Sequence, residues 1–170
     1  MILDSASELR HALALALDGV RNDDHELLVE QLRAQHAHTI TIIGKHDPLR
    51  PEADDREYTC FAFALGLGGV ARHAGAEFVT WLMHRRLLRE LHENKVKDGD
   101  VAIYRAAGHL RHAGRVKGRR IISKWGVGLL YDHQPHEVPS VYGEECAFFR
   151  RLTPRLAADS YRAWLTEQPA

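Results

Sequence analysis

The chain has 170 residues, of which 45% are hydrophobic, and its 23 acidic and 23 basic side chains balance, as is typical of one soluble globular domain. No apolar stretch approaches the ~20 residues that a membrane-spanning helix needs. The start, MILDSASELR, lacks the basic and then apolar segments of a signal peptide, so we expect a cytoplasmic protein; delivery by a machine that reads no N-terminal signal stays open.

Two helices and one strand are predicted in the N-terminal quarter of the chain. The segments 5–18 and 24–36 are amphipathic, and each begins among Asp or Ser residues, which are good N-caps. Residues 38–44 (HTITIIG) alternate β-branched residues and predict a strand. We expect residues 1–36 to form an accessory helical pair outside a core formed by residues 38–151.

Residues 59–66 follow a polar, proline-containing loop at 45–57 and carry an ambiguous pattern. Their Phe and Leu residues alternate as in a strand, but the alanines between them are strong helix formers and the glycine at the end provides a stop. We therefore favour a short, buried helix behind Thr59 as N-cap. A longer helix is predicted over 76–93, where apolar residues recur at i,i+4 spacing.

The second half of the chain predicts an antiparallel sheet. Four segments have the composition and length of strands, at 100–105, 109–116, 119–125 and 146–151. A last helix is predicted over 153–167, since it opens on Thr-Pro and proline is favoured in a first helical turn. Helices followed by antiparallel strands define an α+β class, here in a single domain that spans 1–170.

Charge is unevenly distributed along the chain. Residues 1–60 hold twelve acidic and six basic side chains, whereas residues 105–124 hold seven basic ones and no acidic one. This basic segment predicts either a solvated strand face or a surface that stabilises a thiolate or attracts an anionic substrate. The balanced total charge, with no aromatic residues among the basic ones, disfavours nucleic acid as a partner.

The two cysteines are too few for a disulfide framework and differ in their surroundings. Cys146 lies in a predicted strand, ECAFFRR, and is interpreted as a core residue. Cys60 begins the predicted helix at 59–66, where the helix dipole and unpaired backbone N–H groups favour a thiolate. His112, from a neighbouring strand, could act as its base. The alternative for Cys60 is an inert core position.

The identity of a third polar residue depends on the register of one hairpin. If residues 117–118 form a two-residue turn, Ser123 lies opposite His112 on the same face of the sheet. A three-residue loop would place Lys124 there instead, because a shift of one residue reverses the faces. Ser123 is favoured, since its hydroxyl accepts a hydrogen bond from an imidazole N–H and a protonated lysine has no acceptor.

Five segments in a fixed order carry a resemblance to known enzymes. They are YTCFAFALG, GDVAIY, HAGRV, IISKWG and VYGEE. The stretch from Gly99 to Arg151 resembles the core of NlpC-type and CHAP-type peptidases, both within the papain-like superfamily. The five segments are also similar to an uncharacterised bacterial family with Cys-x-Ala-x-Ala-Leu-Gly, His-Ala and Ser-Lys-x-Gly elements and a late Tyr-Gly. This resemblance covers residues 58–151.

The resemblance implies a papain-like fold, in which a cysteine-bearing helix packs on an antiparallel sheet. It assigns Cys60 as the nucleophile, His112 as the base and the Cys60 backbone N–H to the oxyanion hole. The third residue of NlpC-type enzymes falls at Ser123 or Lys124, and neither is the His, Asn or Gln usually found there. His133, in the loop predicted to follow, is a reserve candidate.

These assignments lead to a thiol hydrolase that cleaves an amide bond in a peptide, an isopeptide or a cell-wall peptide through an acyl-enzyme on Cys60. Acyl transfer and deamidation use the same machinery and stay open, as does a catalytically inactive papain-like module that binds a partner. The substrate class is a peptide or protein, and an anionic character of the substrate stays open. No cofactor and no membrane or nucleic-acid partner is expected, and the sequence makes no prediction of oligomeric state.

Metal binding is the rival class, suggested by His109 with His112 and by His133 with His136. At i,i+3 on a strand the first pair points to opposite faces. The second pair spans a proline loop, and neither a Cys-x-x-Cys nor a His-Glu-x-x-His motif accompanies it. We therefore expect no metal site.

Overall fold

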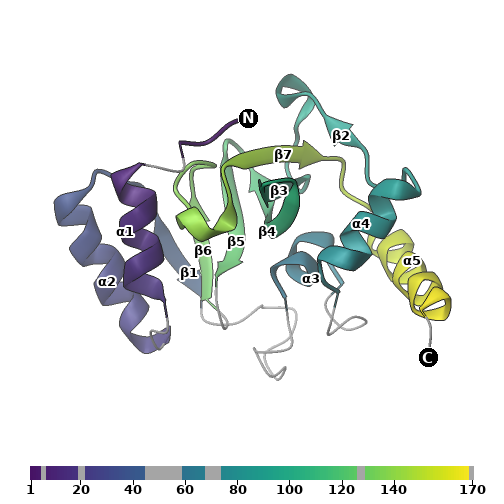
Figure 1. Cartoon of the computed structure of the whole chain (residues 1–170), viewed down its shortest axis with the longest axis horizontal. Helices are drawn as coiled ribbons and strands as arrows, with labels where there is room; N and C mark the ends of the chain where they lie inside the picture. Colours follow the sequence, from purple (N-terminus) through teal and green to yellow (C-terminus); the bar gives the residue numbers. More distant parts are fainter. Residues whose placement is uncertain (5–6, 19–21, 45–58, 68–73, 126–128, 169–170) are drawn as a thin grey trace.

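The computed structural model describes residues 1–4, 7–18, 22–44, 59–67, 74–125 and 129–168. Within these ranges, five α-helices and seven strands form three layers, with one antiparallel sheet between two groups of helices (Figure 1). The α+β class and the antiparallel sheet expected from the sequence are confirmed. The predicted loop at 45–57 lies outside the described residues.

Helices α1 (Glu8–Leu17) and α2 (Asn22–Gln35) confirm the two predicted N-terminal helices. The Ser7 side chain caps α1 by accepting a hydrogen bond from the Arg10 backbone N–H. The apolar sides of both helices pack against the sheet, because Leu13 and Val29 are buried in a core shared with sheet residues. The accessory position predicted for residues 1–36 is therefore wrong: the pair covers one face of the sheet.

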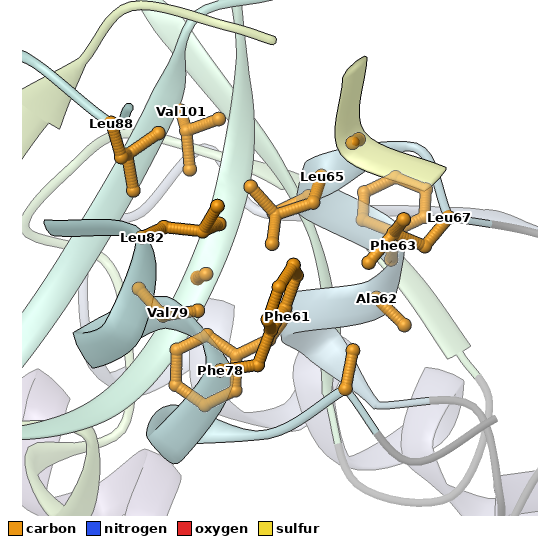
Figure 2. Close-up of a cluster of buried hydrophobic side chains, with 14 of the residues drawn as sticks. Phe61, Ala62, Phe63, Leu65, Leu67, Phe78, Val79, Leu82, Leu88 and Val101 are labelled. Atoms are coloured by element: carbon orange, nitrogen blue, oxygen red, sulfur yellow. The ribbon is translucent and has the colours of Figure 1, made fainter. Parts of the chain in front are cut away.

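Helix α3 (Cys60–Leu65) settles the ambiguous segment in favour of a helix. Its N-cap is Thr59, whose side chain accepts a hydrogen bond from the Ala62 N–H at 3.0 Å. It ends at Gly66, which has φ +71° and whose N–H bonds to carbonyls of the preceding turn. All five residues from Phe61 to Leu65 are buried, so this short helix is held by packing on every side (Figure 2).

Helix α4 (Ala76–His84) is shorter than the predicted 76–93. The chain turns at Arg86, which has φ +57°, and then forms strand β2 (Glu90–Leu91) and the 3-10 turn η1 (Glu93–Lys95). Strand β2 pairs with the edge of the sheet. Its backbone groups therefore form hydrogen bonds across the sheet instead of within a longer helix. The i,i+4 spacing of apolar residues predicted the longer helix, but it could not predict that residues 90–91 would pair with another strand.

The sheet has the strand order β1-β6-β5-β4-β3-β7-β2. All five predicted strands and the final helix are confirmed. Strand β6 is not predicted by the sequence, which places His133 in a loop. Beyond β2, the strands are β1 (Thr41–Gly44), β3 (Val101–Ala106), β4 (His109–Lys117), β5 (Arg120–Trp125), β6 (Leu129–His133) and β7 (Glu145–Phe149). The 3-10 turn η2 (Ser140–Tyr142) precedes β7, and helix α5 (Pro154–Glu167) follows it behind the N-cap Thr153.

The hairpin of β4 and β5 has a register two residues away from the predicted one. Lys117 pairs with Arg120, so the two turn residues are at 118–119, and Ser123 lies opposite Gly114 and not opposite His112. Gly118 has φ +62°, which suits the turn. A shift of two residues keeps the alternation of faces, so Ser123 still shares a face with His112 and Lys124 points the other way.

Two hydrophobic cores lie on opposite faces of the sheet. The core under α3, α4 and α5 includes Phe61, Phe78, Leu82 and Val101 (Figure 2). The core under α1 and α2 is built from Leu13, Val29, Leu32 and the inward residues of the other face of the strands. Which face a strand residue points to therefore decides which of two separate environments it enters.

Candidate active site

Cys60 lies in the first turn of α3, at the edge of the core that this helix shares with the sheet. Thr59 holds that turn in place with two hydrogen bonds. Its Oγ accepts from the Ala62 N–H and donates to the Ala74 carbonyl at 2.5 Å. The Cys60 thiol is free and half-buried, whereas the rest of the helix is buried. The structure thus places Cys60 where the sequence predicted it, at the start of a helix.

The environment of the Cys60 thiol contains opposing electrostatic effects. Burial raises its pKa to about 11, while the backbone N–H groups of Ala113 and Phe61 and the charge of Lys124 act to lower it. The sequence had suggested a thiolate favoured by the helix dipole. Six residues make too short a helix for that effect to exceed the cost of desolvation. At neutral pH the thiol is therefore protonated.

Lys124 is the ionisable side chain that the sheet brings to Cys60. It pairs with Leu130 on β6, and both side chains point to the face on which α3 packs. Only 3% of Lys124 is exposed. The positive charge of Lys124 favours the thiolate form of the nearby Cys60 thiol.

His112 lies on the opposite face of the sheet from Cys60. It pairs with Tyr104, which belongs to the core under α1 and α2, and its ring stacks on Tyr142 with centroids 4.0 Å apart and planes 8° apart. Its neighbour Ala113 faces α3, so alternation along β4 turns His112 away from it. The predicted contact between the Cys60 sulfur and the His112 ring is therefore wrong.

Ser123 and His133 belong to a buried hydrogen-bond chain on the same far face. The Trp125 Nε1–H donates to Ser123 Oγ at 2.7 Å, and that hydroxyl lies 2.8 Å from His133 Nε2. His133 Nδ1 lies 2.7 Å from the Gln134 carbonyl, which can only accept, so Nδ1 carries the proton and Nε2 accepts from Ser123. Ser123 thus orients His133 and not His112, and neither residue reaches Cys60.

Both histidines on this face are neutral at physiological pH. Burial, assisted by the charge of nearby His133, holds the pKa of His112 well below its usual range. Burial likewise lowers the pKa of His133 to about 4. Among the described residues His112 Nε2 has no hydrogen-bond partner. Both rings are shut off from solvent, which is a poor position for a group that must exchange protons with a substrate.

Replacing Ser123 with Ala is expected to destabilise the fold by about 2–4 kcal/mol, because the Trp125 N–H and His133 Nε2 would each lose a buried partner. The free energy of unfolding from urea titration would measure this. Ser140→Ala is the control, since Ser140 is partly exposed on η2 and its side chain has no hydrogen bond to any residue that the structure describes, and a change within about 0.5 kcal/mol is expected there. Equal values for the two variants would contradict a structural role for Ser123.

Two further buried groups shape the far face of the sheet. Arg10 of α1 is only 1% exposed and donates to the carbonyls of Val138 and Gly143, the first at 3.1 Å. Sequence reasoning missed it, because an arginine in an amphipathic helix normally lies on the solvent side. Cys146 on β7 is fully buried, and burial raises its pKa to about 12, as its interpretation as a core residue requires.

Searches for other kinds of site and for related proteins add no further assignment. In the described part of the chain no three His, Cys, Asp or Glu side chains gather as a metal site would require. None of the helices described is long and apolar enough to cross a membrane. Comparisons with protein-family models, with curated proteins and with solved structures found no match.

Proposed function

We propose that the protein is a papain-like thiol hydrolase that cleaves an amide bond through an acyl-enzyme on Cys60, with Lys124 as the ionisable partner. One observation carries the proposal: a largely buried thiol lies at the start of a helix packed on an antiparallel sheet, beside a buried lysine and backbone N–H groups that favour its thiolate. A helix-borne cysteine on such a sheet is the arrangement that the resemblance to NlpC-type and CHAP-type peptidases implies.

The proposed reaction has two steps. The Cys60 thiolate attacks the carbonyl carbon, a C–S bond forms, the C–N bond breaks, and the proton that the thiol lost ends on the leaving amine. Water then attacks the thioester carbonyl, the C–S bond breaks, and the thiol regains a proton while the acid product leaves. The Cys60 backbone N–H is the proposed donor to the oxyanion. Transfer to another amine or deamidation of glutamine would differ only in the acceptor or in the amide.

Acylation by p-nitrophenyl acetate tests the nucleophile without knowledge of the natural substrate. The expected result is a gain of one acetyl group on Cys60, read by intact mass, with release of p-nitrophenolate at a rate that rises with pH up to about 11. Cys60→Ala should remove this acetylation and His112→Phe should not, because His112 lies on the far face. Acetylation confined to other residues would overturn the proposal.

Replacing Lys124 with Met is expected to slow Cys60 acylation at pH 9 on the order of tenfold, because loss of the neighbouring positive charge raises the thiol pKa and so lowers the thiolate fraction. Methionine keeps the buried chain length, and a shift of the pH–rate profile to higher pH separates an electrostatic effect from simple loss of folding. Lys117→Met, an exposed position on the same hairpin, is the matched control. An unshifted profile in Lys124→Met would remove Lys124 from the mechanism.

A second candidate is a papain-like module that binds a partner without catalysis. The raised pKa of Cys60 and the position of His112 on the far face favour it, since papain-like catalysis pairs the cysteine with a histidine. Under this alternative Cys60 reacts no faster with p-nitrophenyl acetate than glutathione does, when each rate is divided by the thiolate fraction of that thiol at the pH of the measurement. The hydrolase requires a Cys60 rate at least tenfold above that reference.

A further inference from the structure

A hollow of about 400 Å³ lies at the C-terminal end of α3, at the opposite end of the helix from Cys60. Its apolar walls come from α3 and from the start of α5, and its charged groups are Arg115 and Arg151. No acidic side chain of the described residues lines it. The lining residues are Ala64, Leu65, Gly66, Gly99, Arg115, Arg151, Leu152, Thr153 and Pro154.

Arg115 is held in place within this hollow. It is half-buried on β4, and its guanidinium lies 4.7 Å from the centre of the Phe63 ring. Its Nε donates to the Ala64 carbonyl at 3.4 Å, near the end of α3. A Cβ built on Gly66 would come within 3.3 Å of Arg115 Nη2, so the glycine leaves room for this close approach. These contacts use one N–H and one face of the guanidinium.

Arg151 approaches the same hollow from the segment after β7. Its guanidinium rests against Gly99, where an added Cβ would lie 2.9 Å from Nη1. The nearby carboxylate of Asp100 is engaged elsewhere, since it accepts from the Arg151 backbone N–H at 3.0 Å and from Arg150 Nη1 at 2.8 Å. Neither Arg115 nor Arg151 forms an ion pair with any residue that the structure describes.

We infer that this hollow binds an organic phosphate, with the two arginines on the phosphate and the apolar walls on its organic part. Two uncompensated guanidinium groups match the charge of a phosphate monoester, and their paired N–H donors match its oxygens. The volume exceeds that of a phosphate group alone, and Leu65, Leu152 and Pro154 offer apolar contact to the remainder. This site is separate from Cys60 and independent of the proposed hydrolase.

The basic segment at 105–124 gains a more specific interpretation from this placement. Lys117 and Arg119 are exposed at the hairpin turn, and Arg111 is exposed at the other, irregular end of β4, so each of these side chains is solvated. Arg115 alone among the arginines of this segment lines the hollow. Binding is therefore expected to depend on Arg115 and not on the overall charge of the segment.

Isothermal titration of the full chain with phenyl phosphate tests the inference, with phenol and inorganic phosphate as separate probes. Saturable binding of phenyl phosphate is expected, at least tenfold tighter than either probe. Arg115→Met and Arg151→Met should each weaken it about tenfold or more, and the exposed Arg111→Met, with the same change of charge, should not. Cys60→Ala should bind as the unaltered chain does, which keeps this result distinct from the hydrolase.

Two outcomes would overturn the site. One is the absence of saturable phenyl phosphate binding by the unaltered chain at millimolar concentration. The other is an equal weakening by Arg111→Met, which would indicate general attraction to basic charge. Thermal unfolding of each variant must match that of the unaltered chain, and proton–nitrogen NMR shifts at Gly66 and Gly99 on titration give a readout that does not depend on the arginine variants.

Discussion

Acidification from pH 7 is expected to cost the fold about 2 kcal/mol at pH 5 and about 3 kcal/mol at pH 4 through His133 alone. The pKa of this buried imidazole is about 4 in the folded chain, against 6.5 for a free histidine. Protonation therefore favours the unfolded chain, so stability is fully present above pH 6.5 and is lost as the pH falls toward 4. The lowered pKa of His112 adds in the same direction.

The charges near His133 do not reverse this sign. Glu137 and Asp132 raise its pKa and Arg120 lowers it, but burial is the largest effect. Glu137 itself has a lowered pKa, because the Gln134 and Thr39 backbone N–H groups and the Thr39 hydroxyl hydrogen-bond its carboxylate. Its contribution is likewise lost as the pH falls, so acid weakens this region through two residues at once.

Urea unfolding of the unaltered chain and of His133→Gln, measured between pH 7.5 and pH 4.5, checks this expectation. Glutamine retains a hydrogen-bonding group near Ser123 and cannot titrate, so the variant should lose stability with acid less steeply. His109→Gln, at the exposed start of β4, should follow the unaltered chain. Parallel curves for His133→Gln and the unaltered chain would show that His133 is not the group that acid protonates.

Deletion of residues 1–36 is expected to abolish folding. The segment contributes the buried side chains of Leu3, Leu13, Val29 and Leu32 to the core on the far face of the sheet. Burial of four such side chains stabilises a fold by roughly 6–12 kcal/mol, which is comparable to the total of about 5–15 kcal/mol for a typical domain. This result replaces the expectation from sequence that residues 1–36 form an accessory helical pair outside the core.

Far-UV and near-UV circular dichroism of a chain that begins at His38 provide the direct measurement. A folded shortened chain would show that the core under α1 and α2 is dispensable. Two point variants in α1 test the same contact within the full chain. Leu13→Ala should destabilise it by about 2–5 kcal/mol, since Leu13 is fully buried, whereas Leu15→Ala should change little, because Leu15 is 68% exposed.

Much of the local structure was predictable because short-range chemistry decides it. Thr59 and Gly66 bound α3, and Thr153 and Pro154 open α5, since cap residues satisfy backbone groups within one turn of the chain. The strands of the meander follow from β-branched and apolar residues bounded by glycines. That Ser123 shares a face of the sheet with His112 was also predictable, because this requires only an even number of residues in the turn between β4 and β5.

The extent of α4 and the existence of β6 required the tertiary structure. The chain leaves the helix near Arg86 so that residues 90–91 can pair with β7, a strand that lies more than fifty residues away. Strand β6 is stabilised between β1 and β5, and β1 comes from the first third of the chain, far from β6 in sequence. Hydrogen-bond partners so distant in sequence leave no local pattern.

For the candidate site, the sequence by itself determined the residue types and their order, and it placed Cys60 at the start of a helix. Only the tertiary structure decided which of them meet. Alternation along β4 and β5 turns His112 and Ser123 to one face and Lys124 to the other, and α3 packs on the face of Lys124. The face on which a helix docks is set by the packing of the whole core, so no motif of a few residues could have shown whether His112 or Lys124 lies on the same face of the sheet as Cys60.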